Sequence, residues 1–206
     1  MRQAGWRLLA KRAFDRTAAA IGLVATAPVM AATAVAIRST MGSPVLFRQQ
    51  RPGFQGHPFE VLKFRTMLDG PGSDAERLTP LGKFLRSTSL DELPQLINVL
   101  RGELSLVGPR PLLMKYLDRY TPEQARRHEA MPGITGWSQI NGRNAIDWDK
   151  KLALDTWYVD HWSLVLDAKI LARTVIHVLR RDGISSEGHV TMPEFQGSSW
   201  TSETAN

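Results

Sequence analysis

Hydrophobic positions in this chain form one long uncharged run near the start and shorter periodic stretches after it. From Thr17 to Ile37 no charged residue occurs. As a straight helix this run would extend roughly 30 Å, enough to cross the hydrocarbon core of a bilayer. Pro28 lies near its middle, where a proline removes a backbone hydrogen bond and clashes with the preceding turn. The pattern therefore predicts a kinked apolar helix.

Basic residues lie on both sides of the apolar run. Lys11, Arg12 and Arg16 precede it, and Arg38 follows it. Because basic flanks tend to stay on the cytoplasmic side of a membrane, both ends of the helix are expected on one face. We therefore predict a re-entrant anchor, bent at Pro28, that holds the protein on the cytoplasmic face of the inner membrane. A helix that crosses the bilayer once stays open as the alternative.

The remaining chain alternates short strand patterns with helical ones. Two β-prone runs, 45–47 and 59–64, are separated by turn residues and predict a hairpin. A turn-rich stretch, 68–80, is expected to be a mobile surface loop. Apolar positions with helical spacing predict helices at 81–86, 91–101, 112–120, 122–130, 147–158 and 163–181.

The last of these stretches has basic residues between its apolar positions. That pattern suits an amphipathic helix lying among lipid head groups, and equally one packed on the core. The fold class expected is α+β and mainly helical, with a membrane anchor, amphipathic interfacial helices and a small β-hairpin. We divide the chain into the anchor and its basic flanks at 1–40, a cytoplasmic domain at 41–197 and a disordered tail at 198–206.

Composition and charge narrow the class of protein. A chain of 206 residues, 43% of them apolar, suits one domain with an anchoring element. There is no cysteine, which excludes disulfides and thiolate metal sites. Many of the charges behind the net +6 flank the apolar run, and no nucleic-acid-binding motif is present. This distribution favours anionic phospholipid as a partner and argues against nucleic acid.

The stretch from Arg86 to Pro111 is the richest in candidate chemistry. At its centre the adjacent acids Asp91 and Glu92 follow small hydroxyl residues and precede an apolar series, which places them in or beside the first turn of a helix. Acids at that position often only complement the helix dipole. Arg86 and Arg110 nearby change the balance, because arginines grouped around carboxylates suit a phosphate-bearing ligand.

Two further cations belong to the candidate site. Lys63 alternates with Phe64 along the second predicted strand, so the two side chains are expected on opposite faces. Arg143 lies in a glycine-broken segment, 131–146, whose glycines would let the backbone approach a ligand. Neither a Walker motif nor G-x-G-x-x-G occurs, so this is not a standard nucleotide cradle. The histidines are too dispersed to predict a metal site.

Six ordered blocks of sequence resemble the bacterial sugar transferases, the small monotopic phosphoglycosyl transferases that load a sugar phosphate onto a polyprenyl phosphate. The blocks are KRAFD, SPVLFRQQRPG, KFRTM, RSTSLDELPQLINVLRGELSLVGPRP, PGITGWSQINGRNAI and GISSEGHVTMPEF. The resemblance runs from about Lys11 to about Gly197. One departure concerns the anchor, since the family commonly has a serine before the bend proline where this chain has Ala27, with Thr26 one place earlier.

The resemblance implies a two-step reaction at Asp91. This carboxylate would attack the β-phosphorus of a UDP-sugar, release UMP and form a phosphosugar ester that polyprenyl (undecaprenyl) phosphate then accepts. Mg²⁺, held in part by Asp91, would neutralise charge. The resemblance also implies that four cations help to neutralise this charge, namely Lys63, Arg86, Arg110 and Arg143. For Glu92 three roles stay open, namely orienting the metal, assisting a phosphate and holding the arginines.

The identity of the sugar and of further partners is less constrained. The GRNAI and GISSEGH blocks resemble the branch that acts on N-acetylated, bacillosamine-type UDP-sugars. Self-association and contact with downstream glycosyltransferases both stay open. So do two other functions: a non-catalytic membrane-bound subunit that binds nucleotide sugar or anionic lipid, and a phosphatase or nucleotidyl hydrolase with water as acceptor. UMP release in the presence of UDP-sugar, Mg²⁺ and polyprenyl phosphate separates a transferase from the first of these.

Overall fold

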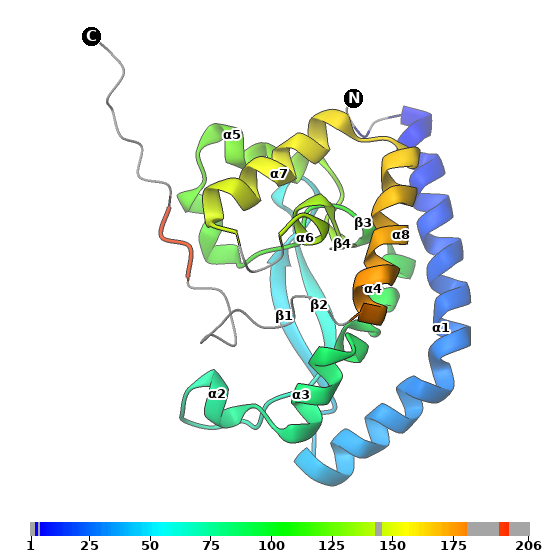
Figure 1. Cartoon of the computed structure of the whole chain (residues 1–206), viewed down its shortest axis with the longest axis vertical. Helices are drawn as coiled ribbons and strands as arrows, with labels where there is room; N and C mark the ends of the chain where they lie inside the picture. The colour runs from blue at the N-terminus through cyan, green and yellow to red at the C-terminus, as the bar shows by residue number, and fades with distance from the viewer. Residues whose placement is uncertain (1–2, 4, 143–145, 181–193, 198–206) are drawn as a thin grey trace.

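The computed structural model describes residues 3, 5–142, 146–180 and 194–197. One long helix, α1, runs along the side of a domain in which a β-hairpin lies centrally and helices lie around it (Figure 1). The mainly helical α+β class and the hairpin are confirmed. The tail 198–206, Arg143 and most of the GISSEGHVTMPEF block lie outside the described residues.

Eight helices and four strands are described, together with short 3₁₀ turns. The helices are α1 (Gly5–Met41), α2 (Asp74–Arg77), α3 (Pro80–Ser87), α4 (Gln95–Arg101), α5 (Pro122–Ala125), α6 (Trp137–Ile140), α7 (Trp148–His161) and α8 (Leu164–Arg180). The strands are β1 (Leu46–Pro52), β2 (Pro58–Phe64), β3 (Ser105–Val107) and β4 (Gly133–Thr135). The 3₁₀ turns are Phe54–Gly56, Leu90–Glu92, Met114–Arg119 and Arg126–Glu129.

Helix α1 is continuous through Pro28. Its light-blue second half turns away from the direction of the first half and approaches α3 (Figure 1). Thr26 Oγ1 donates a hydrogen bond to the carbonyl oxygen of Gly22 over 2.7 Å. A proline and a back-bonding threonine are both recognised causes of helix bending. The apolar helix is therefore present as predicted, with a bend, whereas its re-entrant course through a membrane stays a prediction.

The outer face of α1 is apolar and the inner face carries charge. Val24 is 78% exposed and Ile21 is 65% exposed, whereas Lys11 and Asp15 are buried against the domain. Lys11 Nζ lies 2.6 Å from Asp167 Oδ2 of α8 and 3.6 Å from Asp15 Oδ2. In the described part of the chain, α1 is the one helix long and apolar enough, by length and composition, to cross a membrane. This inverted arrangement is expected where the outward face meets lipid.

The hairpin is longer than the sequence predicted. Its antiparallel register runs from Leu46 opposite Phe64 to Pro52 opposite Pro58, so β1 continues well past its β-prone start. In the extension, the exposed Arg48 and Gln50 alternate with the partly buried Gln49 and Arg51, a pattern that tertiary packing supports even where β-propensity is low. Phe64 packs with Ile37 and Leu85, whereas Lys63 Nζ donates to Glu92, so these neighbours have different surroundings, as their alternation along the strand predicts.

A short parallel pairing of β3 with β4 was not predicted. Ser105 pairs with Gly133, and Val107 pairs with Thr135. A Cβ atom on Gly133 would lie 2.1 Å from Gly108 N, so glycine is required for the two backbones to approach. The interpretation that this glycine admits a ligand is therefore wrong, because its open side is filled by the chain itself.

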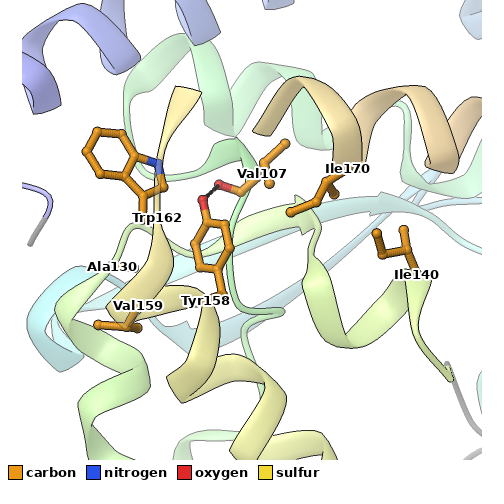
Figure 2. Packing of buried hydrophobic residues seen from close by; sticks show 7 residues of the cluster. All are labelled: Val107, Ala130, Ile140, Tyr158, Val159, Trp162 and Ile170. Atoms are coloured by element: carbon orange, nitrogen blue, oxygen red, sulfur yellow. Dashed lines mark hydrogen bonds between the residues drawn. The ribbon is translucent and has the colours of Figure 1, made fainter. Parts of the chain in front are cut away.

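The main apolar cluster joins these strands to α7 and α8. Figure 2 shows the Tyr158 hydroxyl reaching the backbone of Val107, and Trp162 and Ile170 belong to the same cluster. The Tyr158 hydroxyl lies 3.2 Å from the Val107 carbonyl oxygen and 2.7 Å from Asp167 Oδ1. Burying a tyrosine is favourable when its hydroxyl has such partners, so this residue fixes α7 against β3.

Three predicted elements differ from the structure. The stretch 68–80 contains the short helix α2, whose capping box joins Ser73 and Glu76. The two helices expected at 112–120 and 122–130 are instead 3₁₀ turns and a four-residue helix. Buried contacts to other segments determine this region: Tyr116 packs edge-on against Trp148, for example. Such contacts override a helical pattern in short stretches.

Candidate active site

The predicted acid pair lies in a 3₁₀ turn, Leu90–Glu92, between α3 and α4. The residue before the turn, Ser89, has a left-handed backbone with φ of 57°. The acids lie beside the first turn of α4, as predicted, but in a turn of their own that Ser89 does not cap with its side chain. Ser87 and Thr88 instead donate to the Phe84 carbonyl oxygen in the last turn of α3. The turn is thus a separate element that presents both acids.

Glu92 is held by two cations from distant parts of the chain. Its Oε1 atom accepts hydrogen bonds from Lys63 Nζ at 2.7 Å and from Arg110 Nη2 at 2.6 Å. Burial alone would raise the pKa of Glu92, but Arg110 and Lys63 hold it well below its usual value. The acid, the end of β2 and the loop after β3 are therefore joined at one carboxylate oxygen.

Asp91 differs from its neighbour. It is 8% exposed and lines a cavity, and no residue in the described ranges forms a hydrogen bond or ion pair with its carboxylate. Burial and the charge of Glu92 raise the pKa of Asp91 to about 6, against the opposing influence of Lys63, Arg110 and Arg86. A carboxylate left without partners beside three cations is available to a ligand in the cavity.

The cavity has a volume of about 1250 Å³ and takes in most of the predicted site. Arg86 lines it from α3, with Nε donating to Thr66 Oγ1 over 3.1 Å. Val61 and Leu96 form part of its apolar lining and pack with Ala19 of α1. The structure therefore assembles five of the six predicted residues around one space: Lys63, Arg86, Asp91, Glu92 and Arg110. The sixth, Arg143, lies outside the described residues.

Asn98 supports the site and was missed by the sequence-based prediction. It is fully buried, and its amide group accepts from Leu62 N at 3.0 Å and donates to the Glu60 carbonyl oxygen at 2.7 Å. These bonds fasten α4 to β2, and so fix Lys63 relative to the acid pair. A polar residue on the apolar side of a predicted helix is the signal that could have revealed it, since such a residue needs buried partners.

Arg127 was also missed. Its Nη2 atom donates to the Arg110 carbonyl oxygen at 2.7 Å and to Asp155 Oδ2 at 2.6 Å. Ser138 Oγ donates to the other oxygen of Asp155 at 2.7 Å. Arg127, Asp155 and Ser138 are all buried, so the loop that carries Arg110 is bound to a buried hydrogen-bond network. No local pattern identifies the pair of Arg127 and Asp155, because its members are 28 positions apart.

Comparison with known proteins identifies the family. The sequence profile described as "Bacterial sugar transferase" matches residues 6–181. The chain belongs to the bacterial sugar transferase family. The resemblance found in the six sequence blocks is therefore confirmed over nearly the same range.

Curated relatives of this sugar transferase extend the comparison. The chain is 56% identical over 197 residues to the uncharacterized sugar transferase EpsL of Bacillus subtilis, covering 93% of this chain and 98% of that protein. It is 44% identical to the UDP-glucose:undecaprenyl-phosphate glucose-1-phosphate transferase of Caulobacter vibrioides, covering 84% and 71%. It is 43% identical to the undecaprenyl-phosphate glucose phosphotransferase of Komagataeibacter xylinus, covering 82% of this chain and 36% of the longer relative. These relatives confirm the prediction of a phosphoglycosyl transferase.

The predicted Mg²⁺ would require oxygen ligands, and few acidic side chains at the site can supply them. Among the described residues, no three acidic or histidine side chains gather as a metal site. Glu92 is occupied by Lys63 and Arg110, which leaves the Asp91 carboxylate facing the cavity. Mg²⁺ is commonly bound by one or two carboxylates with water and substrate phosphates. Asp91 would fit that pattern as a single protein ligand.

Proposed function

We propose that this sugar transferase moves a sugar 1-phosphate from a UDP-sugar to polyprenyl phosphate, with a covalent phosphosugar ester on Asp91 as intermediate. One observation carries the proposal. Of two adjacent acids, Glu92 is tied to two cations, whereas Asp91 faces the cavity without a partner in the described part of the chain. Relatives named as undecaprenyl-phosphate sugar phosphotransferases support the general reaction.

In the first step, an Asp91 carboxylate oxygen attacks the β-phosphorus of the donor. The bond between this phosphorus and the bridging oxygen breaks, and its electrons leave with UMP. Arg86, Lys63 and Arg110 line the same cavity and lower the barrier by neutralising charge as it develops. Glu92 keeps Lys63 and Arg110 in position. We include Arg143 among these cations because the resemblance to the family implies that role for it.

In the second step, an oxygen of polyprenyl phosphate attacks the phosphosugar ester and frees Asp91. Dividing the transfer in this way lets one carboxylate serve a soluble donor and a lipid acceptor in turn. The apolar lining contributed by Val61 and Leu96, which pack on α1, suits the approach of the acceptor from the membrane side.

Mg²⁺ bound through Asp91 and the donor phosphates would supply further charge neutralisation. The protein's own part is to keep one oxygen of Asp91 directed into the cavity. The burial of Asp91 within the turn Leu90–Glu92 and its place in the cavity lining support that role.

We further propose that α1 is a re-entrant membrane anchor on the cytoplasmic face. The supporting observations are its exposed apolar outer face, its bend, and basic residues at both ends. Leu164 and Val165, at the start of α8, are also exposed apolar residues. A site close to this surface would meet the head-group phosphate of the acceptor.

The donor sugar is proposed at the level of class. The GRNAI and GISSEGH blocks favour an N-acetylated UDP-sugar, whereas relatives are named for glucose and, in Salmonella typhimurium, for galactose. A panel of UDP-glucose, UDP-galactose and N-acetylated UDP-sugars therefore covers the candidates.

The test is UMP release by the full chain in the presence of polyprenyl phosphate, Mg²⁺ and each donor. Asp91→Asn should lower release by more than about a thousandfold, since it removes the nucleophile. Glu92→Gln should lower it about a hundredfold, because a neutral amide holds the two cations less firmly. Asp118→Asn, an exposed acid outside the cavity, is the matched control and should turn over normally. Normal turnover by Asp91→Asn would overturn the mechanism.

Product analysis distinguishes the remaining alternatives. A non-catalytic subunit would release no UMP with any donor. A hydrolase would release free sugar phosphate at the same rate with and without the lipid. The proposed reaction instead yields a polyprenyl diphosphate sugar in an amount equal to the UMP released.

A further inference from the structure

Two more cations line the cavity and take no part in the mechanism above. Arg51 lies at the end of β1, and Lys151 lies in the first half of α7. Both interact electrostatically with Arg110, which places them around the same residue from two different elements. They therefore extend the positive lining of the cavity beyond the acid pair.

These two residues lie beside a cluster of aromatic side chains. Lys151 Nζ lies 5.2 Å from the ring centroid of Trp148, and Arg51 interacts electrostatically with Tyr116 and Tyr120. Those aromatic residues pack together in a cluster that contains no residue of α1. Another part of the lining, with Val61 and Leu96, packs on α1, as described above.

Positive charge is in excess on this side of the cavity. Arg51 donates to the Gln49 side chain and forms no ion pair with any residue that the structure describes. Burial and Arg110 lower the pKa of Arg51 to about 10. Burial and Arg110 also lower the pKa of Lys151 to about 8, although Asp155 acts in the opposite direction. Gathering cations at a buried surface is unfavourable unless an anion joins them.

Two of the other cavity cations have acids of their own. Arg65 pairs with Asp69 at 2.8 Å, and Arg77 pairs with Asp74 at 2.7 Å. Arg51 therefore differs from Arg65 and Arg77, since no acid among the residues that the structure describes pairs with it.

We propose that Arg51 and Lys151, together with Arg110, form a second phosphate subsite that binds the α-phosphate of the UDP-sugar and retains UMP as it leaves. This inference rests on the proposed function and names the residues that bind the leaving group. When the bond to the β-phosphorus breaks, the departing oxygen gains negative charge, so cations beside it stabilise the transition state.

Binding of UMP to the full chain at constant Mg²⁺ tests the subsite. Arg51→Gln and Lys151→Met should each weaken UMP binding about tenfold, as expected for losing one charge-assisted hydrogen bond. The double variant should lose still more, while uridine, which lacks the phosphate, should bind all these proteins equally. The matched control is Arg48→Gln, a change in the same strand at an exposed arginine paired with Glu60, and it should leave UMP affinity unchanged.

Thermal stability separates binding from a structural role. Because Arg51→Gln relieves repulsion from Arg110, the unliganded variant should melt at or above the temperature of the wild type. The rise in melting temperature caused by UMP should shrink. A variant that melts lower without ligand, and keeps the full UMP-induced rise, would show a structural role and overturn the proposal.

Steady-state kinetics assign the subsite to one of two phosphates. We expect the double variant to lose kcat/KM for the UDP-sugar while keeping the KM for polyprenyl phosphate. A raised KM for polyprenyl phosphate with unchanged UMP affinity would assign these cations to the acceptor and overturn the proposal. If the wild type turns over normally and the double variant keeps its UMP affinity, the subsite fails while the proposed function stands.

Discussion

Two neighbouring acids at the centre of the cavity differ in what surrounds them. Glu92 is bound by Lys63 and Arg110, and its pKa lies well below the usual range. Asp91 has no such partner in the described part of the chain, and its pKa is raised to about 6. Environments that separate two carboxylates in this way assign them different chemistry. Here the tethered acid positions cations, and the other is the nucleophile.

The raised pKa of Asp91 predicts a pH dependence of the first step. The carboxylate must be ionised to attack, so kcat/KM for UMP release in a single turnover without acceptor should rise with pH and level off above about 6. Below that value it should fall about tenfold per pH unit. Glu92 stays ionised throughout this range because its pKa is much lower. A rate that stays constant from pH 5 to pH 8 would contradict the assignment.

The sequence predicted the residues that line the site but not the buried residues that hold them in position. Asp91, Glu92 and Arg110 share one stretch, so their type and spacing were enough to predict them. Asn98 and Arg127 act through partners far along the chain, and their role depends on which segments the fold brings together. Single-sequence patterns carry no information on such pairings.

At the scale of elements, the site depends on how short segments are fastened to one another. The bonds of Asn98 hold α4 to β2, and those of Arg127 hold the loop after β3 to α7. Helix α4 and the hairpin followed from periodicity, since their apolar positions repeat regularly. The 3₁₀ turn with its left-handed Ser89 did not, because backbone dihedrals in a short turn are decided by the contacts around it.

The buried pair of Arg127 and Asp155 gives an element-scale prediction. Arg127→Met leaves Asp155 buried without its partner, so the free energy of unfolding should fall by about 3–5 kcal/mol. Arg127→Met combined with Asp155→Leu should recover much of that stability. Turnover should stay low, because the Arg110 carbonyl oxygen still lacks its donor. Chemical denaturation and UMP release measure the two effects separately.

The neighbouring pair Arg126 and Asp160 is a matched control. It joins the same two elements, the turn Arg126–Glu129 and α7, but lies at the surface. Surface pairs contribute about 0–1 kcal/mol, so Arg126→Met should change stability little and turnover not at all. Recovery of full turnover in the double variant of the buried pair would show that Arg127 does not act through Arg110.

At the scale of the whole molecule, α1 is bound to the domain by charge and presents apolar side chains outward. Lys11 joins it to α8 through Asp167, while the exposed face includes Phe14 and Val24. The sequence predicted the apolar run, its proline and its basic flanks. It did not predict that both halves of α1 pack on the domain through Ala19 and Ile37, since that depends on shape complementarity with segments far along the chain.

A topology experiment follows, because the chain has no cysteine of its own. Trp6→Cys and Ser39→Cys place single thiols at exposed positions near the two ends of α1. If the helix is re-entrant, a membrane-impermeant maleimide should label both variants in sealed inside-out vesicles and neither in right-side-out vesicles. The cysteine-free parent controls for background. Labelling of the two positions from opposite sides would favour a single crossing of the bilayer.

The most direct test of the account is the mass of the full chain after incubation with UDP-sugar and Mg²⁺ without polyprenyl phosphate. We predict that the protein gains the mass of one sugar phosphate, that the gain maps to the peptide containing Asp91, and that it disappears when polyprenyl phosphate is added. Asp91→Asn should gain nothing. An unmodified wild-type protein that nevertheless releases UMP when polyprenyl phosphate is present would contradict the covalent mechanism.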